Sequence, residues 1–180
     1  MKLIHSKTVF RGKVFDVRQD KLQAPDGEEH QIDLIQHHPA VTILPIDEDQ
    51  KIWFVRQYRH PAGVYLLELP AGVMDEGELP QNSALRELRE EIGMGANKLE
   101  KIAGFFLAPG YSTEYMHVFL ARQLYPSPLP GDPDEKIEIE KIPIDQVYKF
   151  IENGEVQDAK SLSALFLAQK TLGVCLDRQG

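Results

Sequence analysis

Three glutamates of one short segment, Glu87, Glu90 and Glu91, have the spacing and the chemistry to bind a metal ion. On a helix, residues three and four positions apart stand over one another, so these carboxylates would lie close together. Like charges this close repel unless a cation lies among them, and carboxylate oxygens are ligands that Mg²⁺ and Mn²⁺ prefer. The segment predicts a Mg²⁺ site, with Mn²⁺ as the alternative, and a phosphorylated substrate that would share the metal.

A helix over residues 80–92 would position these glutamates. Its apolar side chains fall within one arc of about 100°, the width of a core-facing stripe. The residues of this stripe are Ala84, Leu85, Leu88 and Ile92. Pro80 suits the first helical position, and Gly93 suits a left-handed helix end. We therefore expect one buried apolar face with the glutamates on the arc beside it.

Two charged residues would support the acidic face. Arg86 lies one turn before Glu90 and is predicted to pair with it, which would orient a ligand carboxylate. Leu79 is a poor N-cap, so Glu78 is a candidate for satisfying the first-turn amides. Acidic helix faces are usually only solvated, and these residues alone would not exclude that interpretation.

The segment from Gly72 to Met94 follows the pattern G-x5-E-x7-R-E-U-x-E-E-x-G-U, where U is a bulky apolar residue. Its fixed polar and glycine positions are Gly72, Glu78, Arg86, Glu87, Glu90, Glu91 and Gly93. The sequence resembles the Nudix hydrolases at every defined position. The resemblance implies an α+β fold, an α/β/α sandwich with a mixed sheet, and metal-dependent hydrolysis of a diphosphate joined to a nucleoside. It further implies Glu87 and Glu91 as principal metal ligands, Glu90 as a supporting ligand, and coordination by the carbonyl of Ala71.

A second resemblance concerns the substrate. Pro109 lies 16 positions beyond Gly93, as in the ADP-ribose pyrophosphatase branch of that family. This predicts hydrolysis of ADP-ribose to AMP and ribose 5-phosphate, with Pro109 at the substrate. Tyr111 lies 18 positions beyond Gly93, where dinucleoside polyphosphate hydrolases of the family carry a tyrosine, so that substrate class is an alternative. The alternatives are a broader nucleoside-diphosphate-sugar hydrolase acting on GDP-mannose or ADP-glucose, and a nucleotide sensor without turnover.

Hydrolysis needs a base for the attacking water in addition to the metal ligands. We predict Glu90, Glu91 and Glu135 as the catalytic carboxylates, with Asp134 and Glu138 as alternatives for the base. The resemblance favours Arg59 over Arg56 as a contact to the diphosphate or sugar phosphate, with Glu68 assisting at the metal waters or the sugar. Arg56 is predicted to be an exposed strand charge. The aromatic candidates for stacking the base are Phe10, Phe15 and Tyr58.

Alternating apolar and polar residues predict three antiparallel strands over residues 1–39, with a turn at Pro25–Gly27. This small sheet is predicted to mediate homodimer formation, and residues 40–180 to form the hydrolase domain. Segments 40–46 and 51–59 are expected to form a hairpin, and 98–107, 115–124 and 136–144 further strands. Asp145 and Asp158 are the predicted caps of two C-terminal helices, which Gly154 and Gly173 would end.

Composition limits the possible partners. The 180 residues carry 28 Asp and Glu against 20 Lys and Arg, a formal net charge of −8, and no run of basic residues. We therefore expect no nucleic-acid partner. No apolar run approaches the roughly 20 residues of a membrane span, so we expect no membrane partner. A single cysteine, Cys175, excludes an internal disulfide, and a cytoplasmic location is expected.

Overall fold

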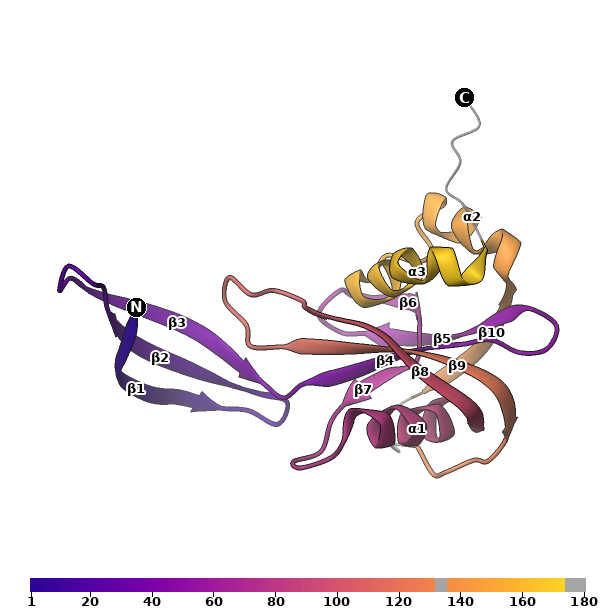
Figure 1. The fold of residues 1–180 in the computed structure, drawn as a ribbon, viewed down its shortest axis with the longest axis horizontal. Coiled ribbons are helices and arrows are strands. Elements are labelled where there is room, and N and C mark those ends of the chain that lie inside the picture. The colour runs from indigo at the N-terminus through magenta and orange to yellow at the C-terminus, as the bar shows by residue number, and fades with distance from the viewer. Residues whose placement is uncertain (132–135, 174–180) are drawn as a thin grey trace. The chain divides into compact units, whose positions relative to one another are not determined.

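The computed structural model describes residues 1–131 and 136–173, and the chain forms two compact units. The first unit contains residues 1–39 and 105–115, and the second contains residues 40–104 and the chain from residue 116 onward. Figure 1 shows the elements of both. No helix among the described residues is both long and apolar enough to cross a membrane.

The first unit is built on a three-stranded antiparallel sheet in the order β1-β2-β3. Its strands are β1 (Lys2–Arg11), β2 (Phe15–Gln23) and β3 (Glu29–His37). Gly27 has a φ of +92° in the turn that joins β2 to β3, a conformation that glycine adopts without steric cost. The three predicted strands and their turn are confirmed.

Residues 105–115 join this unit through β3. The Ile35 amide donates to the Tyr111 carbonyl at 2.7 Å, and the Thr113 amide donates to the Ile35 carbonyl at 2.9 Å. The His37 amide donates to Thr113 Oγ1 at 2.9 Å. The sequence interpretation placed this segment within 40–180, because nothing local to it indicates hydrogen bonding to a strand some 75 residues earlier.

The second unit contains two sheets. One has the order β10-β5-β6 and the other the order β7-β4-β9-β8. β4 pairs antiparallel with β7 and parallel with β9, so the larger sheet is mixed, as predicted. The strands are β4 (Ala40–Pro45), β5 (Lys51–Arg59), β6 (Val64–Glu68), β7 (Ala71–Val73), β8 (Met94–Phe106), β9 (Tyr115–Pro126) and β10 (Ile137–Pro143).

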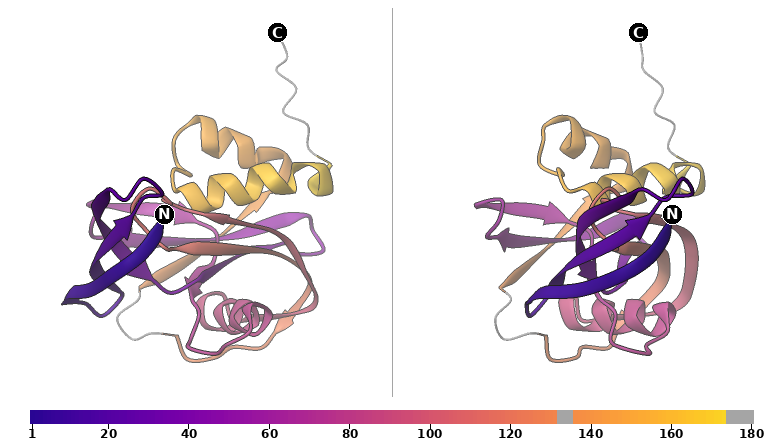
Figure 2. Two further views of the ribbon diagram at one scale, coloured as in Figure 1. Left: turned by 60° about the vertical axis from the view of Figure 1, so that its left-hand side comes forward. Right: turned by 90° about the vertical axis from the view of Figure 1, so that its left-hand side faces the viewer.

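Helices cover both faces of the larger sheet. α1 (Pro80–Glu91) and α3 (Ala159–Leu172) both pack on β4, and all six β4 residues are buried. Figures 1 and 2 show α1 on one side of these strands and α2 (Val147–Glu152) with α3 on the other. The expected α/β/α sandwich is confirmed, and burial on both faces explains why the β4 segment is almost entirely apolar.

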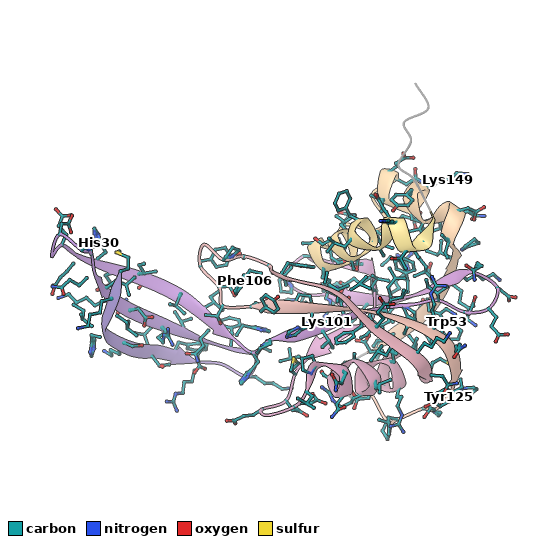
Figure 3. The ribbon with its side chains drawn as sticks, viewed as in Figure 1. His30, Trp53, Lys101, Phe106, Tyr125 and Lys149 are labelled. Atoms are coloured by element: carbon teal, nitrogen blue, oxygen red, sulfur yellow. The ribbon has the colours of Figure 1, made fainter. Side chains whose placement is uncertain are left out.

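The core beneath α1 draws on both sheets. Ala84, Leu88 and Ile92 of α1 and its cap pack with side chains of β4, β5 and β9. Trp53 of β5, labelled in Figure 3, belongs to this core, and its indole N–H donates to Asp47 at 2.8 Å. Three of the four predicted stripe residues are therefore fully buried, whereas Leu85 is only half-buried.

The expected hairpin of residues 40–46 and 51–59 is wrong. β4 and β5 are joined by the tight turn at Asp47–Gln50, but beyond one bridge between Ile46 and Ile52 they belong to different sheets. Both edges of β4 are already paired, with β7 and with β9, so β5 pairs instead with β6 and β10. Adjacency in sequence predicted a pairing that the edges of β4 could not accept.

The C-terminal helices confirm one predicted cap and contradict the other. Asp158 accepts a hydrogen bond from the Ser161 amide at 3.0 Å, and Gly173 ends α3 with a φ of +67°. Asp145 caps nothing, because it lies inside a 3₁₀ turn, η1 (Ile144–Gln146), that begins directly after Pro143 and leads into α2.

Candidate active site

Two of the three predicted ligand carboxylates are buried. Glu87 and Glu91 are 7% and 9% exposed, and with Ser83 they form a row beside the apolar stripe of α1. Glu90 is half-exposed. Burying a carboxylate costs several kcal/mol unless hydrogen bonds or opposite charges compensate, so the partners of these glutamates define what the site can do.

Glu87 lies directly against the backbone of Gly72 in β7. A Cβ atom added to Gly72 would lie 2.1 Å from Glu87 Oε1 and 2.3 Å from Oε2, which no side chain could accommodate. The φ of Gly72 is not in the left-handed region, so backbone conformation does not require a glycine here. Gly72 instead allows the Glu87 carboxylate to approach the strand closely. β7 and α1 together form a cradle for the Glu87 carboxylate.

Glu91 is held by the same strand. Its Oε2 accepts a hydrogen bond from the Ala71 amide at 3.1 Å. The peptide groups of Ala71 and Gly72 thus lie beside the two buried glutamates. Coordination by the Ala71 carbonyl stays a prediction.

Arg86 is the cation at the centre of the acidic face. Its Nη1 donates to Glu87 Oε1 at 2.5 Å and to Glu90 Oε2 at 3.0 Å. Its Nε and Nη2 donate to the two Glu78 oxygens at 3.2 and 3.0 Å. The predicted Arg86–Glu90 pair is confirmed, and the same guanidinium also holds two further carboxylates.

Glu78 connects the loop before α1 to this arginine. It accepts a hydrogen bond from the Asp75 amide at 3.1 Å as well as those from Arg86, rather than satisfying the first turn of α1. The Asn82 and Ser83 amides donate to the Leu79 carbonyl instead. The Arg86 hydrogen bonds hold the pKa of Glu78 below its ordinary value of 4.5, and the Arg86 pKa is raised in turn.

This pKa shift predicts acid sensitivity. Because the pKa of Glu78 is lowered on folding, its contribution to the free energy of unfolding is fully present above about pH 4.5 and is lost as the pH falls through the folded-state pKa. Glu78→Gln should lower that free energy by about 1–2 kcal/mol at pH 7, with a smaller deficit at pH 3.5. Urea unfolding at both pH values measures this, with Glu76→Gln, an exposed neighbour, as control. An equal deficit at both pH values would contradict the assignment.

The glutamates of α1 have the ligand chemistry that a hard divalent cation requires. Glu87, Glu90 and Glu91 supply carboxylate oxygens, and the Gly72 cradle brings backbone to the same point. Among residues 1–131 and 136–173, however, no group of three or more acidic, histidine or cysteine side chains is arranged to hold a metal ion. Arg86 takes up oxygens of Glu87 and Glu90, so a cation would compete with this guanidinium for them.

A second charged cluster contains Arg59 and Glu68. Arg59 Nε and Nη2 donate to the two oxygens of Glu68 at 2.9 and 2.8 Å, and Glu68 is only 2% exposed. Burial alone would raise the pKa of Glu68, but the hydrogen bonds from Arg59 and Lys160 outweigh it and hold the pKa below the ordinary value. The structure thus brings together two residues that were predicted to act on substrate.

Lys160 of α3 was missed by the sequence interpretation. Its Nζ contacts Glu68 Oε2 and donates to Asp158 at 2.7 Å. A lysine in the first turn of a helix carries no local signal for a partner 92 positions earlier. Only the packing of α3 over the end of β6 brings the two together.

The remaining predicted residues lie elsewhere. Arg56 is half-buried rather than exposed, and it pairs with Glu140 and Glu155, which supports a structural role. Glu138 is exposed on β10. Pro109 is exposed in the first unit, and its contact with substrate stays a prediction. The favoured base, Glu135, and its alternative Asp134 lie outside the described residues.

The chain after β9 runs along the C-terminal end of α1. Arg89 Nε donates to the Ser127 carbonyl, and the Leu129 amide donates to the Arg89 carbonyl, both at 3.0 Å. The Ser127 amide donates to the Gly93 carbonyl at 2.9 Å, and Gly93 ends the helix with a φ of +69°, as predicted. These bonds satisfy groups that a helix end leaves unpaired and fix the turn that carries Glu90.

The α/β/α sandwich and the clustered glutamates of α1 agree with the resemblance to the Nudix hydrolases. The NUDIX domain matches residues 36–165, and the chain belongs to the Nudix family. Nudix hydrolases generally use divalent metal ions.

Individual relatives agree with this assignment. An ADP-ribose pyrophosphatase of Bacillus subtilis is 37% identical over 166 residues, covering 91% of this chain and 90% of the relative. A methanol dehydrogenase activator of Bacillus methanolicus is 30% identical over 166 residues, which again cover 91% of this chain and 90% of the relative. A crystal structure of an ADP compounds hydrolase superposes with a TM-score of 0.86 at 30% identity, covering 96% of this chain and 95% of the other.

Proposed function

We propose that this protein hydrolyses the diphosphate linkage of ADP-ribose to AMP and ribose 5-phosphate, with Mg²⁺ as its metal. The observation that carries this proposal is the 37% identity to an ADP-ribose pyrophosphatase across nine-tenths of both chains. The ADP compounds hydrolase of the same fold supports an adenine nucleotide. The complete glutamate set on α1 argues against a sensor that has lost turnover.

Different residues of the chain would bind the metal, orient its ligands, contact the substrate and accept a proton. Glu87, Glu90, Glu91 and the Ala71 carbonyl would hold the metal, which when bound would neutralise phosphoryl charge and help to activate water. Arg86 would fix the orientation of Glu87 and Glu90, as its hydrogen bonds already do. Arg59 would contact the diphosphate, and Glu135 would accept the proton of the attacking water. The P–O bond to the bridging oxygen breaks as the water oxygen bonds to phosphorus.

Relative specificity tests the substrate. We expect the purified protein with Mg²⁺ to show a higher kcat/KM for ADP-ribose than for ADP-glucose, GDP-mannose or diadenosine polyphosphates. Chromatography of the products should show AMP and ribose 5-phosphate in equal amounts. A higher kcat/KM for any of the other substrates would replace the proposed one.

We also propose a homodimer formed through the first unit. Its three-stranded sheet leaves many large apolar side chains exposed, with Phe10 at 57% and Leu3 at 51%, although so small a sheet is not expected to be stable uncovered. Val9, Val14, Phe15 and Ile32 are exposed as well. A second copy of the sheet would cover the apolar side chains on one of its faces, as the family resemblance of the N-terminal strands implies.

The mass in solution tests the dimer. Light scattering should give about twice the chain mass of 20.4 kDa for the wild type. Phe10→Asp should shift the protein to monomer, because a buried unpaired carboxylate in the interface would cost several kcal/mol. Phe166→Asp makes the same substitution at an exposed position of α3 in the second unit and should leave the mass unchanged. A monomeric wild type would contradict the proposal.

A further inference from the structure

The first turn of α3 holds the end of β6 by side-chain contacts. Lys160 Nζ contacts Glu68 Oε2, and Ser161 Oγ accepts a hydrogen bond from the Leu69 amide at 2.8 Å. Lys160 is itself held by Asp158, the residue that caps the helix. Arg59, Glu68, Asp158 and Lys160 thus form a cluster of two acidic and two basic side chains, called the Arg59 cluster. The side chains of Glu68, Lys160 and Asp158 are no more than 13% exposed.

Each residue from Glu68 to Ala71 is hydrogen-bonded to another element. Glu68 and Leu69 are held by Arg59 and α3, as described above. The Pro70 carbonyl accepts from the Ile43 amide at 2.8 Å, and the Ala71 amide donates to Glu91 at 3.1 Å. This segment therefore connects the Arg59 cluster to the cradle of the glutamates.

The connection limits the separation of the two clusters. Glu68 and Ala71 are three residues apart, so their Cα atoms lie at most about 11 Å from one another. The backbone of Glu68 is thus close to the peptide groups beside Glu87 and Glu91. In the proposed function the substrate extends from the glutamates to Arg59, which contacts its diphosphate or sugar phosphate.

We propose that Lys160 is a positioning residue, which acts through Glu68 to set the orientation of the Arg59 guanidinium and so the strength with which the site binds a nucleotide diphosphate. This inference rests on the proposed function. Glu68 holds Arg59 by its Nε and Nη2 edge, so Glu68 fixes the plane of the guanidinium. Lys160 shares Glu68 Oε2 with Arg59 Nη2, and its loss would leave a buried carboxylate with one cation fewer.

Two consequences of removing Lys160 can be measured. Glu68 would lose one of the two cations that fix its carboxylate, so it would hold the Arg59 guanidinium in a less defined orientation, which weakens the contact of Arg59 with phosphate. The hydrogen bond and charge of Lys160 also help to keep the pKa of Glu68 low. Without them, Glu68 would take up a proton at a higher pH and release Arg59.

The test compares Lys160→Met, Lys160→Arg and Lys170→Met, the last being an exposed lysine in the final turn of the same helix. Lys160→Met should raise KM for ADP-ribose about tenfold, as expected for a residue that supports a direct contact, with kcat changed less than about twofold. Its KM should also begin to rise at a higher pH on the acid side than in the wild type. Lys160→Arg should restore most of the binding, and Lys170→Met should behave as wild type.

Binding of ADP in the presence of Mg²⁺, measured by calorimetry, gives a readout that needs no turnover. Circular dichroism first establishes that each variant is folded at the assay temperature. Weaker ADP binding by Lys160→Met, restored by Lys160→Arg, supports the positioning role even if ADP-ribose proves not to be the substrate. Equal ADP affinity in wild type and Lys160→Met would overturn it, whereas failure of wild-type turnover would overturn only the proposed function.

Discussion

Replacing Glu91 by glutamine should reduce kcat by more than about 100-fold. Loss of residues that only support metal ligands commonly costs 10- to 100-fold, and Glu91 is proposed as a ligand itself. Glutamine keeps an oxygen that accepts the Ala71 amide, so the hydrogen bond at 3.1 Å and the packing of α1 should survive. The change therefore removes the charge while preserving the shape. Steady-state kinetics with saturating Mg²⁺ and ADP-ribose measures the effect.

The control for this variant is Glu100→Gln, which removes the same charge from an exposed position of β8. It should leave kcat unchanged. Calorimetric titration with Mn²⁺ should show weaker binding for Glu91→Gln than for Glu100→Gln, and urea unfolding should show similar stabilities. Undiminished turnover by Glu91→Gln would refute the metal assignment.

The sequence was sufficient to predict α1 because its signals are local. Helical spacing located the buried face at Ala84, Leu88 and Ile92, and Gly93 located the end. The same spacing placed Arg86 one turn before Glu90, which is a confirmed ion pair. Each of these inferences depends only on residues within one or two turns, where helix geometry determines which side chains meet.

Contacts between distant elements could not be predicted in this way. Nothing near Lys160 indicates that it meets Glu68, and nothing near Tyr111 indicates that its carbonyl binds the Ile35 amide. The wrong hairpin of β4 and β5 has the same origin, since the edges of β4 are occupied by strands further along the chain. Pairing across a sheet depends on which edges remain free, and that is decided by the whole fold.

The sequence also did not predict that Arg86 would compete with a metal ion for Glu87 as well as Glu90. Spacing predicted that Glu87, Glu90 and Glu91 would crowd and require a cation. In the structure a cation is already present in the form of Arg86, which binds Glu78, Glu87 and Glu90 together. Arg86 thus keeps the carboxylates of α1 close to one another before any metal binds.

Gly72→Ala should lower kcat/KM about 100-fold and reduce the free energy of unfolding by about 1–3 kcal/mol. The added methyl would lie about 2.1 Å from the Glu87 carboxylate, so Glu87 must leave the cradle or β7 must move away from α1. Either movement displaces a proposed metal ligand. Gly110→Ala is the matched control for stability, because its Cβ would meet nothing within 4 Å and its φ is not left-handed.

A double-mutant cycle separates this contact from a general loss of stability. Glu87→Asp shortens the side chain by one methylene and withdraws the carboxylate from the space that the alanine methyl would occupy. If the contact is the cause, Gly72→Ala should destabilise the Glu87→Asp protein by at least about 0.5 kcal/mol less than it destabilises the wild type. Activity should stay low in both backgrounds, since the carboxylate is out of position in each. Strict additivity of the two unfolding free energies would show that Gly72 does not hold Glu87 in place.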